Sequence, residues 1–133
     1  MKKIWIVFVA LVIAVSASFG YYVIENENAE SKNEIVEVKL IINFGNGTKW
    51  NYNLTLNAKD ATVLNALYEA SKLGDFSIKT TYWPSYDSYF VDSIANAGGN
   101  EKYWIYYVNG AMGEVGADKK IVKEGDLIEW RLE

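Results

Sequence analysis

The fold of this chain is decided by an aromatic stretch, Tyr103-Trp104-Ile105-Tyr106-Tyr107-Val108-Asn109-Gly110, and by a later one, Gly125-Asp126-Leu127-Ile128-Glu129-Trp130. The first is typical of a strand that ends in Asn-Gly, the pair that best forms a two-residue hairpin turn because both positions need positive φ. The second is typical of a turn followed by a new strand. Since apolar side chains fall on both faces of residues 103–108, we expect this to be a central strand covered on both sides.

Two strands are predicted nearer the N-terminus. Residues 36–44 and 49–56 alternate between apolar and polar side chains, which is typical of strands with one buried face. Gly45-Asn46-Gly47 lies between them and turns the chain back. The two strands therefore form a hairpin.

One amphipathic helix is predicted after this hairpin. Apolar residues recur at helical spacing from Val63 to Leu73. Two candidate N-cap residues, Asp60 and Thr62, precede them, and Gly74 follows them at the expected end of the helix. Alternation returns afterwards, in residues 76–82, 89–94 and 127–132, and we expect these strands to join the same sheet. The fold class is then α+β, with a β-grasp-like, curled mixed sheet and one helix packed across it.

The N-terminus predicts export. Lys2 and Lys3 precede an uncharged apolar run, residues 4–24, which is long enough to cross a bilayer and would leave the remainder outside the cytoplasm. Residues 1–24 are a signal peptide or signal anchor. We favour a retained single-pass anchor in the cell membrane, whereas cleavage near Val15-Ser16-Ala17 would secrete the protein. Residues 25–34 form an acidic linker, and residues 35–133 form the folded domain.

Composition excludes many functions. The chain has no histidine and no cysteine, so it lacks the commonest general base, the thiolate nucleophile and the usual zinc ligands. We therefore expect a protein that is not an enzyme, with no cofactor and no metal. A hydrolase with a carboxylate site is a minor alternative, although Asp87, Asp92, Asp118 and Asp126 lack the spacing of a calcium loop. The net charge of -4, with a single arginine, argues against a nucleic-acid partner.

These motifs resemble a known family, the domain at the C-terminal end of transcobalamin and intrinsic factor, also found on exported microbial proteins. The resemblance spans Val36 to Leu132 and is strongest in residues 61–67, 89–94, 103–110 and 125–130. It implies a β-grasp-like fold of the soluble-ligand-binding kind. In the vertebrate transporters this domain closes over a corrinoid that is held against a separate helical barrel, and no such barrel exists in this sequence.

A second resemblance is to the small sulfur-carrier proteins related to ubiquitin, through Val108-Asn109-Gly110 and Gly125-Asp126. Those carriers are activated on a C-terminal Gly-Gly. This chain ends in Arg131-Leu132-Glu133, which argues against the carrier function.

Aromatic residues outside the regular strands are the candidate ligand contacts. Trp83, Tyr86 and Tyr89 cluster around Pro84, where no strand or helix face accounts for them, although packing of the loop on a sheet edge is an alternative. Two further candidates, Tyr103 and Tyr107, lie on the strand face opposite Trp104 and would border a pocket if the helix leaves them uncovered.

The sequence thus favours a non-catalytic, extracytoplasmic, membrane-anchored binding module. Its expected partners are the membrane, through residues 4–24, and a small ligand, corrinoid-like or saccharide, or a cell-surface protein. A pure protein–protein display domain is the alternative. Asn46 and Asn53 lie in N-glycosylation acceptor patterns.

Overall fold

A computed structural model describes residues 34–133 of the chain. The predicted signal segment, residues 1–24, and all of the predicted acidic linker except Glu34 lie outside the described residues, so this division of the chain stays a prediction. Among residues 34–133, no helix combines the length and the hydrophobicity needed to cross a membrane.

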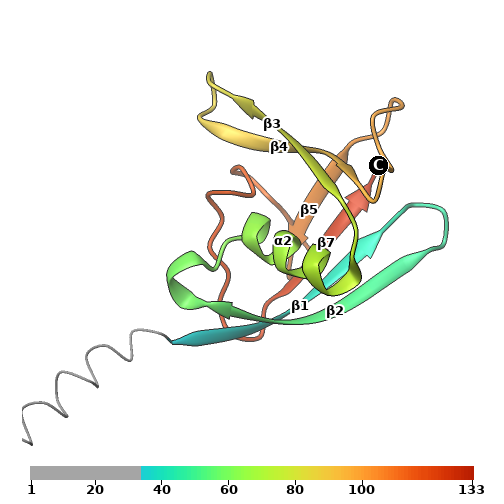
Figure 1. The fold of residues 1–133 in the computed structure, drawn as a ribbon. Coiled ribbons are helices and arrows are strands. Elements are labelled where there is room, and N and C mark those ends of the chain that lie inside the picture. Colours follow the sequence, from blue (N-terminus) through green and yellow to red (C-terminus); the bar gives the residue numbers. More distant parts are fainter. Residues whose placement is uncertain (1–33) are drawn as a thin grey trace, which may run out of the picture. The chain divides into compact units, whose positions relative to one another are not determined.

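The described residues form an α+β fold with a mostly sheet core and one α-helix (Figure 1). The main sheet has five strands in the order β2-β1-β7-β5-β6. Their bounds are Ile35–Asn43 for β1, Lys49–Asn57 for β2, Trp104–Val108 for β5, Ala111–Met112 for β6 and Leu127–Leu132 for β7. The β1–β2 hairpin is antiparallel as predicted, while β1 and β7 are parallel, so the sheet is mixed.

The predicted helix is confirmed as α2, Val63–Gly74, which follows the short 3-10 helix η1, Ala58–Asp60. Thr62 is its N-cap, and the Thr62 hydroxyl accepts a hydrogen bond from the Asn65 N–H at 3.1 Å. The left-handed residue at its end is Asp75, with φ 51°, and not Gly74. Gly74 is close to Tyr52, and a Cβ at position 74 would require the Tyr52 hydroxyl to shift.

The hydrophobic core lies between α2 and the main sheet (Figure 1). The helix contributes an apolar face that includes Val63 and Leu67, and the sheet contributes Leu40, Ile42 and Ile128, all fully buried. Burial of apolar surface is the main force that holds α2 on the sheet.

Strand β5 is an interior strand, as predicted. It pairs with β7 along its whole length and with the two-residue strand β6 at Tyr107 and Val108, and none of its residues is exposed. The Asn109-Gly110 turn itself is confirmed, with φ values of 51° and 84°, and it folds β6 back along the outer edge of β5.

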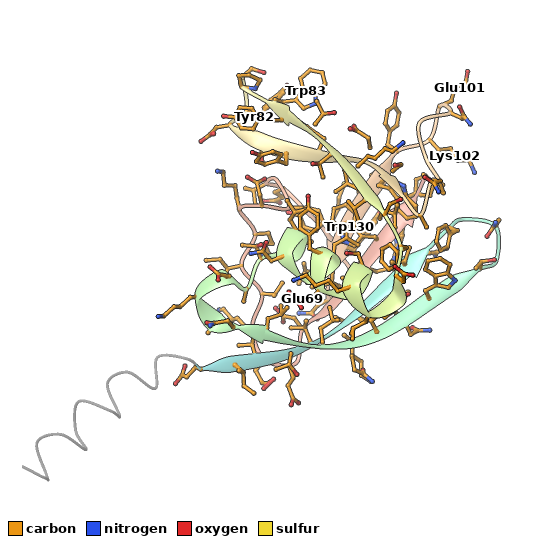
Figure 2. All side chains as sticks on the ribbon, in the orientation of Figure 1. Glu69, Tyr82, Trp83, Glu101, Lys102 and Trp130 are labelled. Carbon is orange, nitrogen blue, oxygen red and sulfur yellow. The ribbon has the colours of Figure 1, made fainter. Side chains whose placement is uncertain are left out.

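Strands β3 (Ile78–Trp83) and β4 (Ser88–Ile94) form a separate two-stranded sheet, so the prediction that they join the main sheet was wrong. The edge of β5 that was open to another strand is taken by β6, which pairs with Tyr107 and Val108. The β3–β4 hairpin instead crosses above α2 and β5 (Figure 1), with Val91 and Ile94 buried in the core. Figure 2 shows Tyr82 and Trp83 near the tip of this hairpin and Trp130 in the interior.

Candidate functional site

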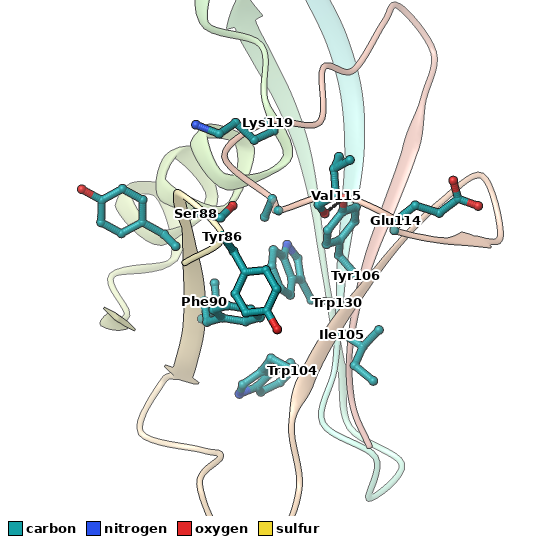
Figure 3. Close-up of a pocket in the computed structure, with 15 residues that line it drawn as sticks. Tyr86, Ser88, Phe90, Trp104, Ile105, Tyr106, Glu114, Val115, Lys119 and Trp130 are labelled. Atoms are coloured by element: carbon teal, nitrogen blue, oxygen red, sulfur yellow. Dashed lines mark hydrogen bonds between the residues drawn. The ribbon is translucent and has the colours of Figure 1, made fainter. Parts of the chain in front are cut away.

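An open groove of about 500 Å³ lies between the β3–β4 hairpin on one side and β5, β7 and residues 113–119 on the other (Figure 3). Aromatic side chains from both sides line it. They are Tyr86, Tyr89, Phe90, Trp104, Tyr106 and Trp130. This volume is within the range of about 300–1,000 Å³ that small-molecule sites occupy.

The hairpin side of the groove is built from exposed rings. Residues 84–87 connect β3 to β4, and this turn includes Asp87 in the left-handed region with φ 46°. The Phe90 ring makes edge-on contacts with Tyr86 at 6.1 Å and with Trp83 at 5.7 Å between centroids. Tyr86 is 70% exposed and Phe90 47% exposed, so both keep most of a face free for another molecule.

The floor of the groove is formed by buried rings of the main sheet. Trp104 and Trp130 are 7% and 2% exposed, and the Tyr106 ring lies 5.5 Å from that of Trp130. The Trp104 Nε1–H donates to the Ala97 carbonyl oxygen at 2.8 Å. The Trp130 Nε1–H, in contrast, is buried and has no hydrogen-bond partner among residues 34–133.

Asp118 fastens the hairpin to the facing loop. Its carboxylate accepts hydrogen bonds from the Ser88 hydroxyl at 2.6 Å and from the Tyr89 N–H at 3.2 Å. Burial alone would raise the pKa of Asp118, but these two donors and the Lys119 charge outweigh it and hold the pKa below its usual value. The approach is close, because a Cβ on Gly116 would overlap the Ser88 hydroxyl.

Tyr106 fixes the same loop from the floor of the groove. Its hydroxyl donates to the Val115 carbonyl oxygen, and a Cβ on Gly113 would collide with the Tyr106 ring. Burial raises the pKa of Tyr106, with a smaller contribution from Asp118 and an opposing one from the Val115 hydrogen bond. Tyr106 is therefore a neutral hydrogen-bond donor at ordinary pH.

The structure brings two of the five predicted ligand contacts into the groove, Tyr86 and Tyr89. Trp83 lies beside the groove and contacts Phe90 without lining the space. Tyr103 and Tyr107 are not in the groove either. Tyr103 is 72% exposed, whereas Tyr107 is largely buried beneath the Arg131 guanidinium, 3.8 Å from the ring centroid. The part that each of the five plays in binding stays a prediction.

Sequence reasoning missed the remaining groove residues. Trp104 and Trp130 are buried in the core, but a core ring can also face a groove where the covering layer is incomplete. The sequence contains a signal that could have identified Phe90. Phe90 is apolar but falls on the strand face opposite to Tyr89 and Val91, so both faces of this strand carry apolar side chains. Asp118 carried none, since its partner Ser88 is 30 residues away in the chain.

Charged side chains at the groove do not form a metal site. Among residues 34–133, no group of three or more His, Cys, Asp or Glu side chains is arranged to hold a metal ion. Asp118 is engaged by Ser88 and Tyr89, and Lys119 lies 3.4 Å from Asp118 and 3.7 Å from Asp87.

Solved structures share this fold at low sequence identity. Haptocorrin, solved in complex with Cbi, superposes with a TM-score of 0.68 at 18% identity, over 76% of this chain and 25% of haptocorrin. A protein from Ruminococcus gnavus ATCC 29149, provisionally described as metal-binding, superposes with a TM-score of 0.59 at 18% identity, over 74% of this chain and 96% of that protein. This chain thus spans a quarter of haptocorrin's length.

Comparison by sequence identifies a family. No curated protein matches the sequence. A family model matches residues 60–133, which include α2, the β3–β4 hairpin and every residue that lines the groove. The family is described as a domain of unknown function, DUF4430. With the haptocorrin likeness, the match agrees with a transcobalamin-like domain. The chain belongs to the DUF4430 family.

Proposed function

We propose that this chain is a non-catalytic binding module and that the aromatic groove is its ligand site. The observation that carries the proposal is the pairing of exposed rings on the hairpin, Tyr86 and Phe90, with the buried rings of Trp104 and Trp130. Large exposed aromatic surfaces are costly in water, and in soluble proteins they mark binding sites. The ligand is a small molecule with a flat apolar face.

The structural relatives support binding rather than catalysis. Haptocorrin was solved in complex with Cbi, and the Ruminococcus gnavus protein carries a metal-binding description, so neither description names a reaction. The sheet order with β1 parallel to β7, and α2 across one face, supports assignment to the β-grasp architecture. That architecture carries many functions, so the site itself has to support the assignment.

We also propose that the module is displayed outside the cytoplasm on a membrane anchor formed by residues 4–24. The support is the sequence of that segment, with Lys2 and Lys3 ahead of it.

The experiment is recovery of a bound ligand. The full chain is extracted from membranes of its own host with mild detergent, and small molecules released on denaturation are identified by mass spectrometry. Tyr86→Ala is expected to weaken ligand binding about 5- to 150-fold and to lower the recovered ligand accordingly, since a stacked ring contributes about 1–3 kcal/mol. Tyr68→Ala, an exposed tyrosine on α2 outside the groove, is the matched control and keeps the ligand. Equal recovery from both variants would rule out the groove as the site.

Protein display is the second candidate, and the outer face of the hairpin favours it. Tyr82 and Trp83 are about half exposed and do not line the groove. Their location near the hairpin tip is typical of an aromatic anchor for a protein partner. In that case Trp83→Ala would abolish chemical cross-linking to the protein partner, whereas Tyr86→Ala would leave the cross-linking unchanged.

A further inference from the structure

We infer that the groove takes an uncharged saccharide and that the Trp130 Nε1–H donates a hydrogen bond to one of its oxygens. This inference rests on the proposed function and deepens it, because it names the class of ligand. Four features of the groove carry it: an unpaired donor, a movable ring, the balance of charge and the stacking surfaces.

The first feature is the unpaired donor. Trp130 is 2% exposed, and its Nε1–H has no acceptor among residues 34–133. Buried N–H groups in folded proteins almost always have an acceptor, because leaving one unpaired is costly. Trp104, the other floor tryptophan, obeys that rule through the Ala97 carbonyl oxygen. A ligand oxygen at the groove floor would supply the acceptor that Trp130 lacks.

The second feature is an exposed ring at the groove. Figure 3 shows the Tyr86 ring next to Trp130, with the indole nitrogen of Trp130 on the side of Ser88 and not behind the Tyr86 ring in this view. Tyr86 is 70% exposed. Tyr86 can therefore swing aside and stack on an entering ligand without breaking a strand hydrogen bond.

The third feature is the charge of the groove. Its charged lining consists of Glu114 and Lys119. Lys119 lies 3.4 Å from Asp118 and 3.7 Å from Asp87, so among residues 34–133 the groove lining has no unpaired cation for an anionic ligand. A cationic ligand would suit the aromatic rings and Glu114, but its N–H donors or methyl groups could not accept from Trp130. The unpaired donor therefore favours a neutral ligand with oxygen acceptors.

The fourth feature is the set of stacking surfaces. A sugar ring has an apolar C–H face, which fits the exposed faces of Tyr86 and Phe90, and a rim of hydroxyls that both donate and accept. Glu114 is exposed and can accept hydrogen bonds from those hydroxyls. A groove of about 500 Å³ with open sides suits a short oligosaccharide.

The test is NMR of the indole N–H groups of the full chain in detergent, titrated separately with maltotetraose, cellotetraose and chitotetraose. The Trp130 indole proton is expected to move downfield with one of these probes, while that of Trp104 stays in place because it is already hydrogen-bonded. Trp130→Phe keeps an aromatic floor without the donor and is expected to weaken that saccharide about tenfold. The matched control is Trp50→Phe, a half-buried tryptophan away from the groove, which keeps full affinity.

The outcomes separate this inference from the proposed function. Saccharide binding without a shift of the Trp130 signal would overturn the role of Trp130, and this readout needs no variant to fold. Binding of choline chloride with none of the three saccharides would overturn the ligand class while leaving the groove as a site. Failure of all these probes, combined with Tyr86-dependent recovery of some other molecule by mass spectrometry, would also overturn the saccharide inference alone. If ligand recovery is unaffected by Tyr86→Ala, the proposed function falls as well.

Discussion

Asp118 is the residue on which the shape of the groove most depends. It joins two segments that share no strand pairing, through the hydroxyl of the buried Ser88 and the backbone of Tyr89. Hydrogen bonds to a charged acceptor contribute about 1.5–3 kcal/mol each, and removal of the acceptor leaves the Ser88 hydroxyl unpaired.

Asp118→Ala is expected to lower the free energy of unfolding by about 2–3 kcal/mol. Urea unfolding followed by tryptophan fluorescence measures the change. Glu37→Ala is the control, because the Glu37 side chain is exposed on β1 and makes no hydrogen bond within residues 34–133. Its effect should stay within about 0.5 kcal/mol. Similar losses in the two variants would contradict the role given to Asp118.

Acid should remove the contribution of the Asp118 carboxylate to the stability of the fold. Its pKa is lower in the folded protein than in the unfolded chain, so the charged carboxylate stabilises the fold above the unfolded value of about 3.9. The stabilisation is lost as the pH falls through the lower, folded pKa. The difference in urea midpoint between the wild type and Asp118→Ala should therefore be full at neutral pH and shrink below about pH 4. Glu129, whose pKa is also lowered, is common to both proteins and cancels in this difference. A pH-independent difference would contradict the prediction.

At the scale of elements, the turn after β5 connects the two stretches that decide the fold. The Asn109 side chain donates to the Asp126 carboxylate at 2.9 Å and accepts from the Leu127 N–H at 2.9 Å. Asn109 also takes φ 51°, which asparagine tolerates better than most residues. One side chain thus supports both the β5–β6 turn and the start of β7.

Asn109→Ala is expected to destabilise the protein by about 1–2 kcal/mol, from the lost hydrogen bonds and from the positive φ. Asn109→Asp keeps the acceptor for Leu127 but places two carboxylates together. Its loss of stability should therefore be largest at neutral pH and smaller where one carboxylate is protonated. Thermal unfolding followed by circular dichroism at two pH values compares the variants, and equal melting temperatures for the wild type and Asn109→Ala would contradict the connection.

An element could be predicted from the sequence where its formation depends on its own residues. The β1–β2 hairpin and α2 follow from alternation, from Gly45 and Gly47, and from the Thr62 cap, all of which act within a few residues. The separate sheet of β3 and β4 could not be predicted, because it depends on whether β6 occupies the edge of β5. The groove floor was hidden for a similar reason: alternation places Trp130 in the core but does not reveal whether its N–H finds an acceptor.

At the scale of the whole molecule, the remaining prediction concerns the N-terminal segment. If residues 4–24 are a retained anchor, the full chain should stay in the membrane fraction after an alkaline carbonate wash, because burial of a helix of about 20 apolar residues is effectively irreversible. Deletion of residues 4–24 removes the targeting signal and the anchor together, so that variant should not reach the membrane fraction. A mature protein in the culture medium that begins just after Ala17 would show that the segment is cleaved.

The separate sheet of β3 and β4 has a consequence for how the molecule can change. Strands β3 and β4 pair only with each other, so they share no strand hydrogen bonds with the five-stranded main sheet. Residues 82–87 at its tip can be exchanged or lengthened without altering the register of any strand in the main sheet, while Ser88 and Asp118 keep the hairpin seated. The domain therefore combines a constant frame with a replaceable recognition loop. A library randomised at those positions should yield stable proteins with new binding preferences.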